Sequence, residues 1–368
     1  MTVDDIHRLM GTWAPAAVAW ERDNIGLQCG DPSMAVRGIL VTLDVTEAII
    51  EEAFRKRANL IVSHHPLLFR PLRAVTPATA TGRCVRVLAR HEIAVYSAHT
   101  NLDFTRGGTS HALAEVIGLS DVEFLETPYR LQKKVVAYVP AEQADAVAAA
   151  MAEAGAGRIG NYDSCSFRAP GTGTFRGNES SHPAVGSRGR LERVPEIRME
   201  MIVPQWNVDR VLSAMAKAHP YEEPAYDVYP LENLSRDFGM GVIGSLREPV
   251  PLKTYLGRIK NSLGTGALRW TGNPRSVVRR VAACGGSGGD LLEAAIGAGA
   301  DLFITADIKY HRFHDAAGRI GLVDAGHYET EFPVVRAVVE RLGKEFQERG
   351  VRIPVFATAR STNPTHYV

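Results

Sequence analysis

The sequence predicts an α/β protein in which two similar lobes form one core, interrupted by an inserted α+β segment. Two internal repeats support this fold class. A strand–helix–strand pattern occurs at residues 41–65 and again at residues 283–307, and a different strand–helix pattern occurs at residues 133–155 and again at residues 197–219. The length points the same way, because 368 residues exceed what one hydrophobic core normally serves. We therefore expect a first lobe at 1–125, an insert at 126–247 and a second lobe at 248–368.

The two lobes are predicted from segments that align without gaps. VTLDVTEAIIEEAFRKRANLIVSHH (41–65) aligns with ACGGSGGDLLEAAIGAGADLFITAD (283–307), and the exit strands ANLIVS and ADLFIT match in character. Each segment predicts a strand, a tight turn, a helix and a second strand. Repeats of this length are typical of duplicated domains. The first lobe ends with GGTSHALAEVIGLSDVEFLE (107–126), which predicts a helix and a short strand.

The insert is predicted to have the ferredoxin-like order. KKVVAYVPAEQADAVAAAMAEAG (133–155) and IRMEMIVPQWNVDRVLSAMAKAH (197–219) each predict a strand and a helix. SCSFRAPGTGTFRG (164–177) predicts a strand pair between them, and AYDVYPL (225–231) follows the second helix, so the order is βαβ twice. The polar tract 178–194 is expected to form a flexible loop. The glycine runs 155–160 and 171–177 are expected to mark turns, with phosphate-binding loops as the alternative.

Composition narrows the class of partner. The formal charge of +1 gives no electrostatic reason to expect nucleic acid, and no segment approaches the roughly 20 apolar residues of a membrane span. The four cysteines form no CxxC pair, and the first residues do not resemble a secretory signal. We therefore expect a cytoplasmic protein whose ligand is a small molecule.

Paired histidines give the strongest functional signal. His64 and His65 end the apolar run 58–63, and ligands of parallel sheets collect outside the carboxyl ends of the strands. In each lobe, a further apolar run is followed by a histidine with an acid four positions later. These pairs are His99 with Asp103 and His327 with Glu331. Two lobes that fold alike would bring these groups into one cleft, and histidine with carboxylate suits zinc, manganese or iron. Two exposed loop histidines are the alternative interpretation.

Several other residues are candidates for substrate binding or proton transfer. The run GGSGGD (285–290) lacks the GxGxxG spacing of a nicotinamide site, but its Ser287 and Gly288 precede a predicted helix whose start is suited to phosphate. Asp44 ends the matching strand of the first lobe and is a candidate substrate contact, with a helix N-cap as the commoner role. Past the second exit strand, Asp307 is a further substrate candidate. His311 or His314 is a candidate proton carrier.

Seven stretches of the chain resemble one family, the GTP cyclohydrolase I type 2 homologues, also called Nif-three-like dinuclear-metal hexameric proteins. The stretches are DNIGLQCGD (23–31), NLIVSHHPLLF (59–69), HTNLD (99–103), GRIGNYDSCSF (157–167), HPYEEPAYDVYPL (219–231), CGGSGGDLL (284–292) and GHYETE (326–331). SHHP, HTNLD and GHYETE in this order are highly specific to the family. One departure is TAD at 305–307, where family members often carry TGD.

The resemblance implies a site for two divalent ions, with zinc expected first and manganese, iron or cobalt as alternatives. Its implied ligands are His64, His65, Asp103, His327 and Glu331. His99 would orient a ligand or move a proton. The resemblance also implies a ring-like homohexamer of two stacked trimers, and an insert similar to the PII and divalent-cation-tolerance proteins, which marks the longer subgroup of the family.

The functional hypothesis is a metal-dependent hydrolase acting on a nucleotide or related cyclic or phosphorylated substrate. Two ions about 3.5 to 4 Å apart lower the pKa of a water and clamp substrate oxygens. The sequence does not distinguish attack on C8 of GTP, as in a cyclohydrolase, from attack on phosphorus, as in a phosphoesterase. The alternative is a metal-binding regulator or scaffold whose insert senses a small molecule or binds a protein partner.

Overall fold

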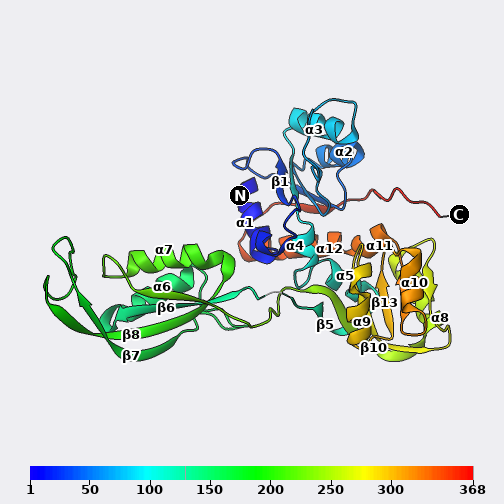
Figure 1. Ribbon diagram of the computed structural model, residues 1–368. Helices are drawn as coiled ribbons and strands as arrows, with labels where there is room; N and C mark the ends of the chain where they lie inside the picture. The colour runs from blue at the N-terminus through cyan, green and yellow to red at the C-terminus, as the bar shows by residue number, and fades with distance from the viewer. Residues whose placement is uncertain (129, 368) are drawn as a thin grey trace. The chain divides into compact units, whose positions relative to one another are not determined.

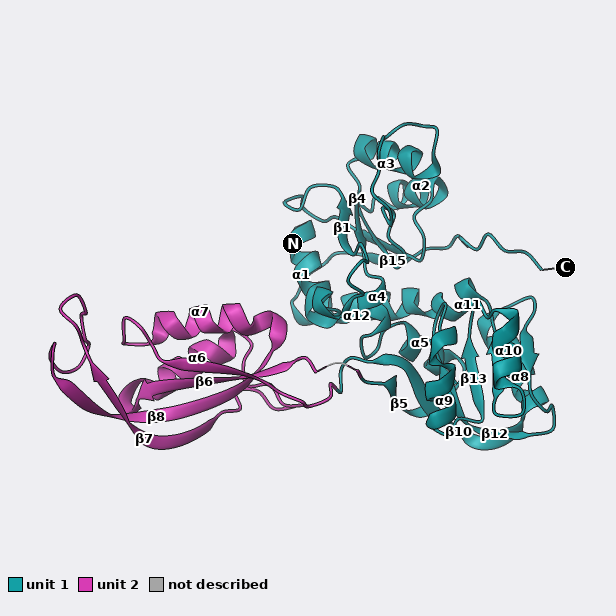
Figure 2. Cartoon of the chain, in the orientation of Figure 1, with its two compact units in different colours: residues 1–127, 236–368 teal, residues 128–235 magenta. Residues whose placement is uncertain are grey.

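The computed structural model describes residues 1–128 and 130–367, and the chain divides into two compact units (Figures 1 and 2). Unit 1 contains residues 1–127 and 236–368, and unit 2 contains residues 128–235. The protein is mixed α/β. No helix in the described part of the chain combines the length and the hydropathy that a membrane span needs.

The first sheet of unit 1 has five strands in the order β1-β4-β3-β2-β15. The strands are β1 (Gly26–Cys29), β2 (Ile39–Thr42), β3 (Leu60–Ser63), β4 (Ala94–Ser97) and β15 (Val355–Ala357), and only β1 is antiparallel to its neighbour. Helices α2 (Glu47–Arg55) and α3 (Ala80–His91) cover one face, and α1 (Val3–Trp13) and α12 (Pro333–Glu348) cover the other. Because both faces are covered, the central strands are apolar throughout.

The second sheet of unit 1 has six strands in the order β11-β14-β13-β12-β10-β5. The strands are β5 (Ser120–Glu126), β10 (Met240–Pro251), β11 (Arg269–Thr271), β12 (Val277–Ala283), β13 (Leu302–Thr305) and β14 (Gly321–Asp324). Helices α5 (Thr109–Val116) and α8 (Leu252–Leu263) pack on one face, and α9 (Leu292–Gly297) and α10 (Tyr310–Ala316) pack on the other. The short helices α4 (Thr100–Asp103) and α11 (His327–Glu331) follow β4 and β14.

The two aligned segments have the same strand register. Val41 lies opposite Val62 in the parallel pair β2–β3, and Ala283 lies opposite Ile304 in the parallel pair β12–β13. These four positions also correspond in the alignment of the two segments. A helix crosses between the strands in each case, so both exit strands end at the same edge of their sheet as the strands beside them.

The lobes of unit 1 are not continuous segments of the chain. β5, placed by the sequence analysis at the end of the first lobe, pairs with β10 of the second sheet. Conversely, β15 pairs with β2 of the first sheet, and α12 packs on that sheet through Val338 and Leu342. Residues 236–247, expected in the insert, belong to unit 1 because they contain the start of β10. Hydrophobic patterns predict where strands lie, but not which sheet they join.

Unit 2 has four antiparallel strands in the order β7-β8-β6-β9. Its elements are β6 (Gln132–Pro140), α6 (Ala144–Glu153), β7 (Phe167–Arg176), β8 (Leu191–Pro204), α7 (Val208–Ala218) and β9 (Tyr226–Pro230). Both helices pack on one face of the sheet. The prediction of a strand pair within 164–177 is wrong. This stretch forms the single strand β7, which pairs along its whole length with β8. β8 begins at Leu191, inside the tract expected to be a loop, and the glycine run 171–177 lies mostly in β7.

Candidate metal centre

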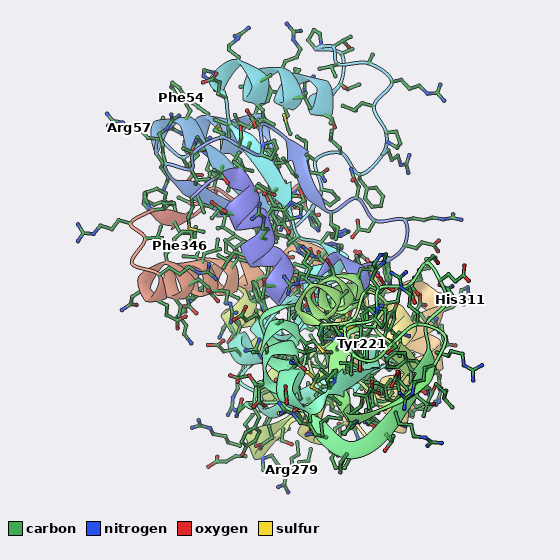
Figure 3. All side chains as sticks on the ribbon, turned by 90° about the vertical axis from the view of Figure 1, so that its left-hand side faces the viewer. Phe54, Arg57, Tyr221, Arg279, His311 and Phe346 are labelled. Carbon is green, nitrogen blue, oxygen red and sulfur yellow. The ribbon has the colours of Figure 1, made fainter. Side chains whose placement is uncertain are left out.

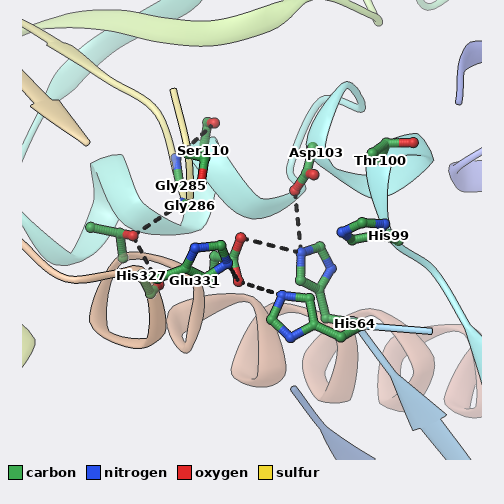
Figure 4. Close-up of polar contacts among 12 residues, drawn as sticks. His64, His99, Thr100, Asp103, Ser110, Gly285, Gly286, His327 and Glu331 are labelled. Carbon is green, nitrogen blue, oxygen red and sulfur yellow. Dashed lines mark hydrogen bonds and ion pairs between the residues drawn. The ribbon is translucent and has the colours of Figure 1, made fainter. Parts of the chain in front are cut away.

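The candidate centre lies at the carboxyl ends of β3, β4 and β14 in unit 1 (Figure 4). His64 and His65 continue the parallel ladder beyond β3, because their backbone N–H groups donate to Thr42 O at 3.1 Å and Leu43 O at 2.9 Å. Asp103 ends α4, which follows β4. The helix α11 follows β14 and brings its own histidine and carboxylate to the same place.

Glu331 lies close to histidines from both lobes. Its Oε2 lies 2.9 Å from His65 Nε2 and 3.1 Å from His327 Nε2, and its Oε1 lies 3.8 Å from His64 Nε2. His64 Nε2 lies 3.4 Å from Asp103 Oδ1. The structure therefore brings the five residues implied as ligands into one cluster.

Buried atoms in this cluster lack partners. Among the described residues, His64 Nε2, Asp103 Oδ1 and Glu331 Oε2 are buried and have no well-directed hydrogen bond. His64 is 2% exposed and Glu331 is 4% exposed. A buried polar atom without a partner is costly, and a bound cation is one recognised reason for it. Imidazole nitrogen and carboxylate oxygen are also the ligands that zinc, manganese and iron accept, so the residues fit a metal centre.

Each histidine around the centre is held through the nitrogen that faces away from it. The acceptors of the Nδ1 atoms are Ala98 O for His64 at 2.9 Å, Asp44 Oδ1 for His65 at 2.8 Å, Asp23 Oδ1 for His99 at 2.9 Å and Asp307 Oδ2 for His327 at 2.7 Å. An acceptor at Nδ1 places the proton there and leaves the lone pair on Nε2. In all four rings Nε2 therefore points away from these acceptors, and its lone pair is available to a metal once the ring is neutral.

His99 is closer to the centre than an orienting residue needs to be. It forms a group with His64 and His65 whose ligand atoms all lie within 4.8 Å of one another, and a second such group contains His65, His327 and Glu331. The residue that holds His99, Asp23, was missed by the sequence analysis. The signal was present, because Asp23 begins the stretch DNIGLQCGD.

The predicted substrate-binding acids contact the outward-facing nitrogens of the candidate ligands. Asp44 uses both oxygens, since Oδ1 accepts from His65 and Oδ2 accepts from Thr362 Oγ1 at 2.6 Å. Asp44 is also not the N-cap of α2, because that role belongs to Thr46, whose side chain accepts from Ile49 N. Asp307 accepts from His327 and from Ser287 Oγ. These acids orient imidazoles in the structure.

The remaining two predictions fall outside the cluster. The Gly288 N–H donates to Thr305 Oγ1 at 2.9 Å, so this amide is already occupied and does not face an anion. His311 is exposed on α10, and its ring neighbours among the described residues are Tyr310 and His314. Figure 3 shows its side chain at the outer edge of the molecule. Periodicity placed His311 near a strand end, but the helix directs it outward.

Comparison with known proteins places the chain in a family. The model of Duf34/NIF3 (NGG1p interacting factor 3) matches residues 1–364. The chain belongs to the DUF34/NIF3 family. Among curated relatives, "GTP cyclohydrolase 1 type 2 homolog" of Halalkalibacterium halodurans is 38% identical over 365 residues, which are 99% of this chain and 98% of the relative. The protein of the same name from Mycobacterium tuberculosis is 39% identical over 366 residues, covering 98% and 95%.

Solved structures agree with this membership. A Bacillus cereus protein related to NIF3 matches with a TM-score of 0.89 and 39% identity, covering 100% of this chain and 99% of that one. A Staphylococcus aureus protein matches with a TM-score of 0.81 and 29% identity, covering 100% and 99%. The resemblance inferred from the motifs is thus confirmed over nearly the whole chain.

The electrostatics of this NIF3 chain suit a cation. Burial lowers the pKa of His65, but the neighbouring carboxylates of Asp44 and Glu331 raise that pKa to about 10. The interaction with Glu331 raises the pKa of His327 to about 9, against the effect of burial. Burial raises the pKa of Glu331, yet the surrounding imidazoles hold it well below its usual range. The carboxylates thus favour positive charge at the positions where the ligand atoms converge.

A glycine allows α11 to approach the second sheet closely. Gly286 has φ +62°, and a Cβ at this position would lie 2.2 Å from Glu331 Oε1 and 3.4 Å from His327 Cε1. Its N–H donates to Thr330 Oγ1 at 3.0 Å, which ties the glycine turn to α11. A residue with a side chain would both strain this turn and displace the carboxylate.

Proposed function

We propose that this NIF3 protein holds two divalent ions through His64, His65, Asp103, His327 and Glu331 and that it is a hydrolase. One observation supports this above the others. Three of these residues have buried ligand atoms without hydrogen bonds, while every imidazole is fixed through its other nitrogen. That arrangement is costly without a cation and is usual around a bound one. Zinc is the first expectation, with manganese, iron or cobalt as alternatives.

The residues around such a site have different roles. A pair of divalent ions supplies Lewis acidity and makes a water nucleophilic near neutral pH. Asp44 and Asp307 hold His65 and His327 through Nδ1, which would leave Nε2 of each ring for a bound ion. His99, backed by Asp23, is placed to accept a proton from a water or to return it to a leaving group. His311, which is exposed, has no part in this assignment.

The proposed substrate is a nucleotide or a related cyclic or phosphorylated compound. The name of the relatives, "GTP cyclohydrolase 1 type 2 homolog", supports a nucleotide. Five protein ligands shared by two ions leave coordination positions for water and substrate, which favours an enzyme over a closed structural site. Hydrolysis consumes one water and breaks either a C–N bond of the base or a P–O bond of a phosphoester.

We also propose the architecture that the family resemblance implies. The shared register of β2–β3 and β12–β13 supports a duplicated lobe, and the strand order of unit 2 supports a ferredoxin-like insert similar to the PII and divalent-cation-tolerance proteins. The proposed assembly is a homohexamer of two stacked trimers. The cysteines in the described residues are unpaired, which supports a reducing compartment such as the cytoplasm.

A second candidate function is a metal-stabilised regulator whose insert binds a small molecule. Unit 2 contains a cavity of about 720 Å³ on its sheet, lined by side chains that include Tyr138, Phe175, Glu196, Arg198 and Tyr221. This volume lies within the range of small-molecule sites. The cavity is lined by residues of unit 2 alone, so a small molecule could bind there without contacting the residues of the metal centre.

Metal content tests the proposal. Elemental analysis of protein purified without added metal or chelator should give two ions per chain, and Asp103→Ala should lower this to one or none while the protein stays folded. The metal-loaded wild type is then screened against nucleotides and phosphoesters. A variant that binds no metal yet keeps full hydrolysis would overturn the mechanism. A folded wild type with little metal would favour the regulatory function.

A further inference from the structure

The residues after β15 form an extended segment whose contacts begin in the first lobe. We call residues 358–367 the C-terminal segment. Thr358 Oγ1 donates to Glu52 Oε2 at 2.7 Å, and Ala359 N donates to Glu52 Oε1 at 3.0 Å. Glu52 is 5% exposed and lies on α2. A buried carboxylate that accepts two hydrogen bonds fixes the start of the segment firmly.

The middle of the segment contacts residues that hold the metal ligands. Thr362 Oγ1 donates to Asp44 Oδ2 at 2.6 Å, and Asp44 Oδ1 accepts from His65 Nδ1 at 2.8 Å. Asn363 Nδ2 donates to Glu329 Oε1 at 3.0 Å. Glu329 is 8% exposed and lies on α11 between His327 and Glu331. Consecutive residues of the segment therefore reach both lobes of the centre.

The far end of the segment lies against the second lobe. The ring of Tyr367 is 2.8 Å from the place where a Cβ of Gly266 would lie, and its hydroxyl is 3.1 Å from the corresponding position at Gly326. Gly326 is the residue before α11. In Figure 1 the red segment runs from β15 and passes above α11 in that view. The absence of side chains at these two glycines lets the segment pack closely.

We propose that Thr362 is a positioning residue of the metal centre, which acts on His65 through Asp44, and that docking of the C-terminal segment and metal binding strengthen each other. The proposal rests on the metal centre of the proposed function, but not on hydrolysis. A carboxylate held at one oxygen only can rotate about its Cα–Cβ and Cβ–Cγ bonds. The Thr362 hydroxyl fixes the second oxygen of Asp44, so the first stays aimed at His65 Nδ1.

His64 provides an internal contrast. Its Nδ1 pairs with the backbone carbonyl of Ala98, which needs no contact from the segment. Thr362 should therefore tune the centre through His65 and leave the attachment of His64 unchanged. Because coupling between two binding events is reciprocal, an ion that fixes His65 must also favour the docked segment.

Three variants at two neighbouring positions test the positioning role. Thr362→Val keeps the shape but removes the hydroxyl, Thr362→Ser keeps the hydroxyl, and Thr365→Val removes a hydroxyl from an exposed residue of the same segment whose described hydrogen bond uses its backbone N–H. Zn²⁺ affinity is measured by competition with a chromophoric chelator, and the visible spectrum is recorded with Co²⁺. We expect about a 10- to 100-fold loss of affinity and an altered Co²⁺ spectrum in Thr362→Val only. Wild-type affinity and spectrum in Thr362→Val would overturn the role.

Amide hydrogen exchange of the wild-type protein tests the reciprocal effect without any substitution. Exchange in residues 359–365 should slow when Zn²⁺ is added, whereas unchanged exchange would overturn the coupling. The outcomes separate the two proposals. A protein that binds Zn²⁺ and shows both effects but hydrolyses nothing removes the hydrolase function and leaves this inference intact, while a wild type that binds no ion overturns both.

Discussion

The two lobes supply the same chemical parts of the centre from different places. In the first lobe the imidazole of His65 follows the exit strand β3, and the orienting carboxylate of Asp44 comes from the turn after β2. In the second lobe the carboxylate of Asp307 follows the exit strand β13, and the imidazole of His327 comes from α11. His65 and Asp307 are aligned positions of the two segments. The position after the exit strand thus holds a candidate ligand in the first lobe and an orienting residue in the second, whereas the position aligned with Asp44 is Gly286.

One carboxylate lies beside histidines from both lobes. Glu331 lies next to imidazoles from each lobe, and it is more buried than either orienting acid, with its side chain 5% exposed against 37% for Asp44 and 51% for Asp307. Low exposure strengthens its interactions and raises the cost of losing it. We therefore expect metal binding to depend most on Glu331, less on the orienting acids and least on the glycine turn.

Glu331→Gln should have the largest effect because it removes the charge shared by both lobes. We expect loss of both ions and of hydrolysis, exceeding the roughly 10- to 100-fold change typical of a residue that only holds a ligand. Elemental analysis and the substrate screen measure the two losses. Glu340→Gln, at an exposed position on α12, is the matched control. If Glu331→Gln kept one ion with wild-type affinity, the lobes would bind metal independently.

His111 should make the stability of the protein depend on pH. Both of its ring nitrogens are buried without a hydrogen bond among the described residues, and burial, aided by Arg106, lowers its pKa to about 4. The unfolded chain binds a proton below its usual pKa of about 6.5, so stability must fall as the pH falls from there toward 4. His65 and His327 have raised pKa values, so in metal-free protein their contribution is lost instead as the pH rises through about 9 to 10.

The test is urea unfolding of metal-free protein at pH 7 and pH 5. His111 should account for a loss of about 2 kcal/mol in the free energy of unfolding between these values. His111→Leu cannot take up the proton and should remove this part of the pH dependence. An equal pH dependence in wild type and variant would mean that His111 is hydrogen-bonded or solvated in the folded protein.

The clustering of the candidate ligands was predictable because local pattern and topology agree. His64 and His65 end an apolar strand, the two histidine–acid pairs follow comparable strands, and parallel strands bring their carboxyl ends to one edge. Asp23 and Thr362 were not predicted, because their roles depend on contacts between distant parts of the chain, such as that between Thr362 and Asp44. No periodicity in a sequence records such a contact.

The fold shows the same limit. The order of strands and helices within both repeats matches the prediction, since each element has its own hydrophobic period, although β8 begins before the expected segment, at Leu191. The assignment of β5 to the second sheet, and of β15 and α12 to the first, was not predicted, because pairing depends on which apolar faces remain uncovered after the lobes form. Only tertiary packing decides this.

Asp44→Asn and Asp307→Asn should sharpen the comparison of the two acids that orient His65 and His327. Each variant keeps the shape but removes the charge that fixes the Nδ1 proton of its imidazole, so we expect a loss of Zn²⁺ affinity of about 10- to 100-fold. Asp44→Asn should lose more Zn²⁺ affinity than Asp307→Asn, because Asp44 is less exposed and is held at both oxygens. Chelator competition measures both. A larger loss in Asp307→Asn would show that exposure does not decide their importance.

Gly286→Ala should have the smallest effect on Zn²⁺ binding. A comparison with Gly299 separates backbone strain from contact with Glu331. Gly286 and Gly299 both have left-handed backbones, with φ +62° and +71°, but a Cβ at Gly299 would meet no atom within 4 Å. Each alanine should cost about 1 to 2 kcal/mol of stability through backbone strain. Only Gly286→Ala places a methyl group against Glu331, so only this variant should also weaken Zn²⁺ binding. Equal Zn²⁺ affinity in the two variants would mean that Glu331 can shift without loss, and the second lobe would then tolerate movement of the carboxylate on which the whole centre depends.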